Sequence, residues 1–185
     1  MVDWQGVIDE FYEPDSGLRD ILLRHSRSVA RLALDIAHAR GLDLADDDIE
    51  AAAMLHDIGI FLTDAPGIQC TGREPYIRHG ILGGALLRGQ GLPEWVARVA
   101  ERHTGAGITA DEIVRNKLPL PAVDLVPESL LERLVCYADK FYSKSGDMRR
   151  KTLDHVRASI QKHFPDSAPR FQALVDEFGA PPADD

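Results

Sequence analysis

Several histidines and aspartates stand where this sequence would be expected to bury apolar side chains. Burying an imidazole without a partner costs about 1–3 kcal/mol, so each needs a hydrogen bond or a metal ion. One such histidine would be an ordinary hydrogen-bonded core residue, whereas a set on successive helices predicts a metal site. The set falls on, or at the ends of, segments whose apolar residues recur every three or four positions, and consists of His25, His56, Asp57, His79, His103 and Asp139.

The types of these side chains indicate which ions they would bind. Mixed nitrogen and oxygen ligation suits one or two divalent ions of Fe, Mn, Zn, Ni or Co, with Mg as a further candidate. His56 and Asp57 are neighbours, and neighbouring side chains on a helix point about 100° apart. Both can reach one site only over a helix end or between two metals. Gly59 ends the helix two residues later, so this placing is feasible. No other cofactor site is expected.

The elements that would position these residues are predicted to be helices. The first long one is capped by Asp15 and Ser16 and ends at Gly41. The stretch from Thr63 to Pro75 is expected to be a loop, and no segment shows convincing strand alternation. The pattern therefore predicts an all-α fold, a single helical bundle. The expected helices span about 16–41, 46–58, 76–90, 93–103, 109–116, 128–142, 153–163 and 169–178.

The length and composition suit a single domain. The chain has 185 residues, of which 44% are hydrophobic, enough for one sizeable core. Two cysteines without a CxxC motif, no leader sequence and no apolar run of about 20 residues predict a cytoplasmic protein that does not associate with membranes. The chain is expected to begin with an N-terminal extension at 1–17, followed by the main helical domain at 18–145. C-terminal helices at 146–179 are expected to pack on that same domain, and 180–185 to form a frayed tail.

The overall charge is acidic, with 21 basic and 30 acidic residues and a formal net charge of −9. Affinity for nucleic acids comes mostly from Lys and Arg, so stable nucleic-acid binding is not expected. A phosphorylated small molecule is expected as the partner, because a bound metal supplies local positive charge. A locally basic stretch could draw such an anion towards the site, and contains Lys140, Lys144, Arg149, Arg150 and Lys151.

The ordered set His25, Leu55–Gly59 (Leu-His-Asp-Ile-Gly) and Asp139 resembles the H…HD…D signature of the HD superfamily of metal-dependent phosphohydrolases. The resemblance covers Leu22 to Ser143. Within the superfamily, the sequence is most similar to a small subfamily of stand-alone HD proteins. The resemblance implies a helical HD domain. It further implies that His79 and His103 belong to a second metal site, with one aspartate bridging the ions. The first metal would be held by His25, His56, Asp57 and Asp139.

The resemblance implies metal-dependent hydrolysis of a small, nucleotide-like phosphate ester or anhydride by a metal-bound hydroxide. Ile60 stands where related dinucleoside-polyphosphate hydrolases often carry a lysine, so another cation would have to stabilise the phosphoryl oxygens. Arg102 and Lys140 flank proposed ligands, and with Asp57 they are the expected catalytic residues. Two alternatives stay open: a metal-binding regulatory module without catalysis, and a di-iron oxygenase on the same scaffold.

Overall fold

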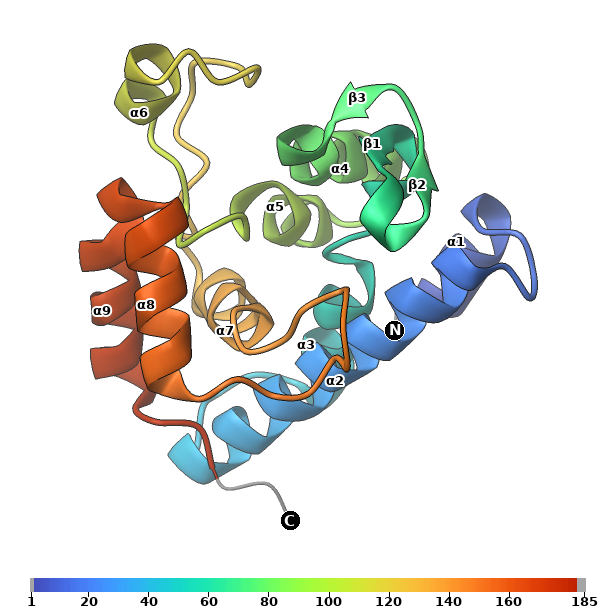
Figure 1. The fold of residues 1–185 in the computed structure, drawn as a ribbon. Coiled ribbons are helices and arrows are strands. Elements are labelled where there is room, and N and C mark those ends of the chain that lie inside the picture. Colours follow the sequence, from blue (N-terminus) through green and yellow to red (C-terminus); the bar gives the residue numbers. More distant parts are fainter. Residues whose placement is uncertain (1, 183–185) are drawn as a thin grey trace.

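The computed structural model describes residues 2–182 and shows a helical protein with one small sheet (Figure 1). Short 3-10 helices flank the sheet, at Ile60–Leu62, Pro66–Ile68 and Tyr76–Arg78, and a fourth lies at Pro165–Ser167. The α-helices are α1 (Trp4–Phe11), α2 (Gly17–Arg40), α3 (Asp46–Leu55), α4 (His79–Gly89), α5 (Glu94–Arg102), α6 (Ala110–Arg115), α7 (Leu130–Asp139), α8 (Leu153–His163) and α9 (Ala168–Phe178).

The sheet corrects the all-α expectation. β1 (Thr63–Ala65) lies between β2 (Cys70–Thr71) and β3 (Glu74–Pro75), within the segment expected to be a loop. β1 pairs antiparallel with β2 and parallel with β3. Strands of two or three residues are too short to show an alternating pattern, and their formation depends on backbone pairing. The protein is therefore mostly helical but not strictly all-α.

The long helix α2 begins and ends as its sequence predicts. The Ser16 side chain caps it by accepting a hydrogen bond from the backbone N–H of Arg19. Gly41 ends it in the left-handed conformation, with a φ of 61°, which glycine adopts without steric cost. Correct placement of both ends keeps His25 in register with the buried face of this helix.

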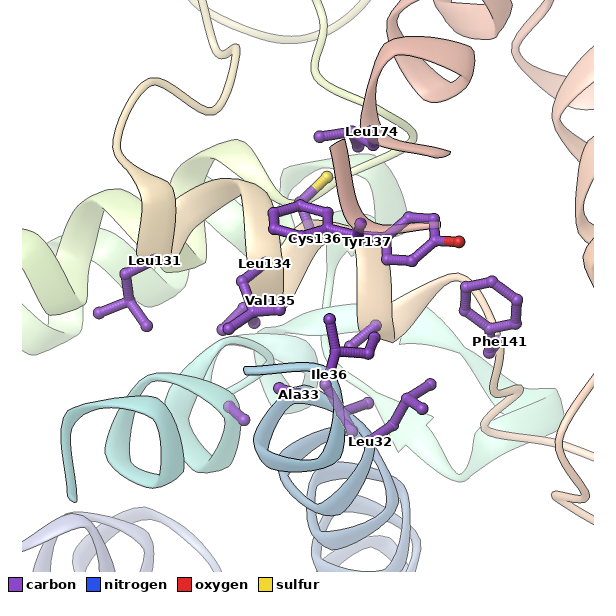
Figure 2. Close-up of a cluster of buried hydrophobic side chains, with 14 of the residues drawn as sticks. Leu32, Ala33, Ile36, Leu131, Leu134, Val135, Cys136, Tyr137, Phe141 and Leu174 are labelled. Atoms are coloured by element: carbon purple, nitrogen blue, oxygen red, sulfur yellow. The ribbon is translucent and has the colours of Figure 1, made fainter. Parts of the chain in front are cut away.

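A core between α2, α3 and α7 holds these three helices together. Figure 2 shows Leu32 and Ile36 of α2 facing Leu134 and Val135 of α7. All four side chains are at most 1% exposed. Fully burying a side chain of this kind contributes about 1.5–3 kcal/mol, so this contact fixes α2 and α7 relative to each other.

Helices α4 and α5 approach each other closely because a glycine lies at their contact. A Cβ on Gly80 would stand 2.5 Å from the backbone oxygen of Ala100, closer than any ordinary contact. The absence of a side chain at this position lets the backbones meet. As a result the start of α4 lies beside the end of α5, which brings His79 and His103 together.

The N-terminal and C-terminal segments pack on this framework. Within the expected N-terminal extension, α1 buries Val7 and Ile8, and the Tyr12 hydroxyl donates a hydrogen bond to the carbonyl of Ile58. At the other end, Phe171 and Phe178 of α9 pack against Tyr137 of α7. The expected frayed tail falls partly on residues 183–185, which lie outside the described residues. Among the helices of residues 2–182, none has the length and apolar character needed to span a bilayer.

Candidate metal centre

Four buried side chains from three parts of the chain form a first group of potential metal ligands. His25 comes from the middle of α2, His56 and Asp57 directly follow α3, and Asp139 ends α7. One ligand atom from each lies within 4.8 Å of all the others. The Nε2 atom of His25 is 2.9 Å from Oδ1 of Asp139, and the Nε2 atom of His56 is 3.0 Å from Oδ2 of Asp57. The arrangement could hold one cation.

A second group shares Asp57 with the first. Its members are Asp57, His79 and His103, all buried. The Nε2 atoms of the two histidines are each 3.4 Å from Oδ1 of Asp57. Because Oδ2 faces the first group and Oδ1 faces the second, the carboxylate of Asp57 lies between two potential cation sites.

Three of the four histidines are oriented by the same kind of local hydrogen bond. Their Nδ1 atoms lie 2.6–2.8 Å from the carbonyl oxygen three residues earlier, in the pairs His56–Ala53, His79–Tyr76 and His103–Ala100. Each Nδ1–H donates to its carbonyl, which turns Nε2 towards the centre. In the neutral imidazole, Nε2 then carries a lone pair that can bind a cation. Histidine ligands of metals are commonly fixed in this way.

The donor set fits a metal ion. The Nε2 atoms of His79 and His103 are 2.9 Å apart, yet both carry lone pairs, so they cannot form a good hydrogen bond with each other. Both oxygens of Asp57 are fully buried, and no described residue gives either a hydrogen bond of regular geometry. The Lys144 ammonium, 2.6 Å from Oδ2, compensates part of the buried charge, whereas Oδ1 has only the imidazoles of His79 and His103 beside it, at 3.4 Å. A cation in each group would satisfy both features.

The electrostatics of the centre favour positive charge. Burial alone would raise the pKa of Asp57 and Asp139, but nearby cationic and imidazole groups hold both values well below the usual range. Burial would also lower the pKa of His56, yet the charge of Asp57 and the bond to Asp139 raise it to about 9. Burial, together with neighbouring His103, lowers the pKa of His79 to about 3. The second group thus presents neutral imidazoles beside an ionised carboxylate.

The expected catalytic cations do not both reach this centre. The guanidinium of Arg102 forms ion pairs with Glu128 at 2.7 Å and Glu132 at 3.0 Å, so Arg102 takes part in a separate network. Lys140 does lie at the site, where its Nζ atom is 2.7 Å from Oδ2 of Asp139 and donates to the carbonyl of His103. Its placing suits holding two ligands in position.

Lys144 also lies at the centre, although the sequence marks it only as part of the basic stretch. Its side chain is 13% exposed, and its Nζ atom lies 2.6 Å from Oδ2 of Asp57. The ammonium also lies over the ring of Tyr76, 6.0 Å from the centroid, and Tyr76 stacks on His79. No periodic pattern marks this lysine, because it follows α7 in an irregular segment.

A cavity of about 470 Å³ adjoins the centre. Asp139 of the first ligand group contributes to its wall. The remaining lining combines cationic, hydroxyl and aromatic groups, among them Lys140, Lys144, Lys151, Ser143, Ser145, Ser159, Tyr76, Tyr142 and Phe164. Cations and aromatic rings around one cavity suit a ligand that carries both phosphate and a planar base.

Comparison with known proteins identifies similar chains. The family model described as HD domain matches residues 22–143. A tRNA (cytidine(56)-2'-O)-methyltransferase of Thermoplasma volcanium is 36% identical over 172 residues, 93% of this chain and 45% of the relative. One of the same name from Picrophilus torridus is 32% identical over 87% of this chain and 42% of the relative. An uncharacterized protein of Methanocaldococcus jannaschii is 29% identical over 83% of each. No solved structure matches significantly.

These comparisons correct two expectations. The two relatives with named functions are enzymes, but methyltransferases, so the expected phosphohydrolase activity is wrong. Their names refer to tRNA, which also contradicts a small phosphorylated partner and the exclusion of nucleic acid. The net charge averages over the whole surface, whereas cations gather locally at the cavity, so an acidic chain can still bind an anion there. The chain spans less than half the length of both methyltransferases.

Proposed function

We propose that this chain, which belongs to the HD domain family, is the metal-binding domain of a tRNA-modifying enzyme and binds tRNA beside its metal centre. The observation that carries the proposal is the position of the Asp57 carboxylate between two buried ligand groups. The centre lies next to a cavity whose lysines suit a phosphate backbone.

The proposal assigns a ligand role to each of the six residues. His25, His56, Asp57 and Asp139 would hold one divalent cation, and Asp57, His79 and His103 the other. Mixed imidazole and carboxylate donors suit first-row transition ions. A divalent ion supplies a compact positive charge that attracts phosphate and hydroxyl oxygens. Lys140 would keep Asp139 and the carbonyl of His103 in position.

The tRNA partner is proposed from the names of the relatives and from local charge. Lys140, Lys144 and Lys151 line one cavity, and lysines on phosphates supply much of the affinity of proteins for nucleic acids. The named relatives are more than twice as long as the part matched here. The proposal for this chain is therefore limited to metal binding and tRNA binding, and does not include methyl transfer. We also propose that 18–145 forms the HD unit, with 146–179 packed on it.

Metal analysis combined with tRNA binding tests this function. The purified protein should hold divalent transition metal by elemental analysis, and should bind an unmodified tRNA transcript with an affinity that falls as salt rises. Asp57→Ala should lose most of the metal, because Asp57 belongs to both ligand groups. Asp43→Ala is the matched control, since Asp43 is exposed and lies outside both groups.

Two results would contradict the proposal. Full metal content in Asp57→Ala, with helicity retained by circular dichroism, would reject the metal centre. Failure of the metal-loaded protein to bind tRNA at low salt would reject the tRNA role and leave the metal centre standing.

A further inference from the structure

Lys144 lies at the boundary between the metal centre and the cavity. Its Nζ atom is 2.6 Å from Oδ2 of Asp57, and its side chain also lines the cavity. The contact is an ion pair without regular hydrogen-bond geometry. The lysine therefore contacts a proposed metal ligand on one side and a space suited to an anion on the other.

The oxygen that Lys144 contacts belongs to the first ligand group. Oδ2 of Asp57 is 3.0 Å from Nε2 of His56 and 3.2 Å from Nε2 of His25. A divalent cation bound by these three groups would take up the same oxygen. Two positive charges at one carboxylate oxygen repel each other strongly inside a protein, where water screens charge poorly. Lys144 and the cation therefore compete for Asp57.

The segment that carries Lys144 can accommodate a change of partner. It is an irregular segment between α7 and α8, so no helical hydrogen bonds hold its backbone. Lysine has a flexible four-carbon stem, so its ammonium can move from one partner to another by rotamer changes. Turned away from Asp57, the ammonium would face the cavity, near Lys140 and Lys151.

We propose that Lys144 couples the two ligands of this protein: it leaves Asp57 when a divalent cation binds, and then binds a phosphate group of RNA in the cavity. This inference rests on the proposed function. The ligand class is a phosphodiester of an RNA chain, and the rings of Tyr76 and Phe164 line the same cavity, where they would contact a base. Coupling of this kind is reciprocal, so metal should tighten RNA binding and RNA should tighten metal binding.

Replacing Lys144 tests the coupling in both directions. In Lys144→Met, affinity for Mn²⁺ or Zn²⁺, measured by chelator competition without RNA, should rise about 5–150-fold. Affinity for an unmodified tRNA transcript should fall, and adding metal should no longer improve it. Lys144→Arg, which keeps the charge, should restore part of the metal dependence. Lys162→Met is the matched control, because Lys162 is exposed on α8 and does not line the cavity.

The wild-type protein is measured first, which separates this inference from the proposed function. Absence of metal or tRNA binding there rejects the proposed function. If both bind, unchanged metal affinity in Lys144→Met and in a second variant, Lys144→Gln, would overturn the coupling. Equal tRNA affinity of the wild type with and without metal would overturn it as well. Displacement of tRNA by equimolar AMP would show that the cavity takes a free nucleotide and would overturn the RNA assignment.

Discussion

A single methyl group added at Gly80 should both destabilise the protein and weaken its second ligand group. The Cβ of Gly80→Ala would lie 2.5 Å from the backbone oxygen of Ala100, where ordinary contacts begin at 3.4 Å. The two helix backbones would therefore have to separate by about 0.9 Å, the difference between these distances. Overpacking of this kind costs about 1–3 kcal/mol. For a protein of this size each kcal/mol lowers Tm by about 2–4 °C.

The same carbonyl orients a proposed metal ligand. The backbone oxygen of Ala100 accepts the hydrogen bond from Nδ1 of His103 at 2.8 Å, so displacing it should turn the imidazole. Loss of such an orienting partner typically lowers metal affinity about 10–100-fold. Gly80→Ala should therefore weaken binding of one metal ion and leave the other ion bound.

Urea denaturation and metal titration by calorimetry measure these two effects. The control is Gly89→Ala, because a Cβ at Gly89 meets nothing within 4 Å. That variant should bind metal normally and gain up to about 1 kcal/mol in stability from helix propensity. Wild-type stability together with wild-type binding of both ions in Gly80→Ala would refute the reasoning about the contact between α4 and α5.

Two further predictions concern the second ligand group and the attachment of α9. His103→Ala should bind one divalent ion fewer than the wild type by elemental analysis, whereas His38→Ala, which removes an exposed histidine outside both groups, should bind the same number. Equal metal content in all three proteins would exclude a second site. Glu112 accepts hydrogen bonds from Arg170 of α9 and from the N–H of Thr109. Burial would raise the pKa of Glu112, but these contacts lower it below its usual value of 4.5. A carboxylate with a lowered pKa stabilises the folded state above its unfolded pKa, and this contribution disappears as pH falls through the folded value. Glu112→Gln should therefore be less stable than the wild type at pH 7 by urea denaturation, and the difference should shrink below pH 4.5; a constant difference would contradict this linkage.

The structure brings together the six residues that the sequence singles out, and helix periodicity explains why they could be found, because it reports which face of each helix is buried. His25 falls between two apolar residues of the α2 stripe, and the structure places it at 1% exposed. Polar side chains at such positions need partners, and a common centre supplies partners to several of them at once. Helix limits were also readable where one residue decides them, as with the Ser16 cap and Gly41.

Features that depend on distant residues could not be predicted in this way. The partner of Arg102, Glu132, lies 30 positions away, and nothing near Arg102 indicates that it forms this ion pair. Lys144 reaches Asp57 from an irregular segment with no periodicity to follow. The strands of 63–75 pair through their backbones, which side-chain patterns in segments this short do not report.

Anomalous diffraction from crystals grown with Mn²⁺ or Zn²⁺ tests the central claim most directly. The account predicts two anomalous peaks beside Asp57. One should lie among His25, His56, Asp139 and Oδ2 of Asp57, and the other among His79, His103 and Oδ1 of Asp57. Peaks at other surface carboxylates only, with none within bonding distance of Asp57, would contradict it.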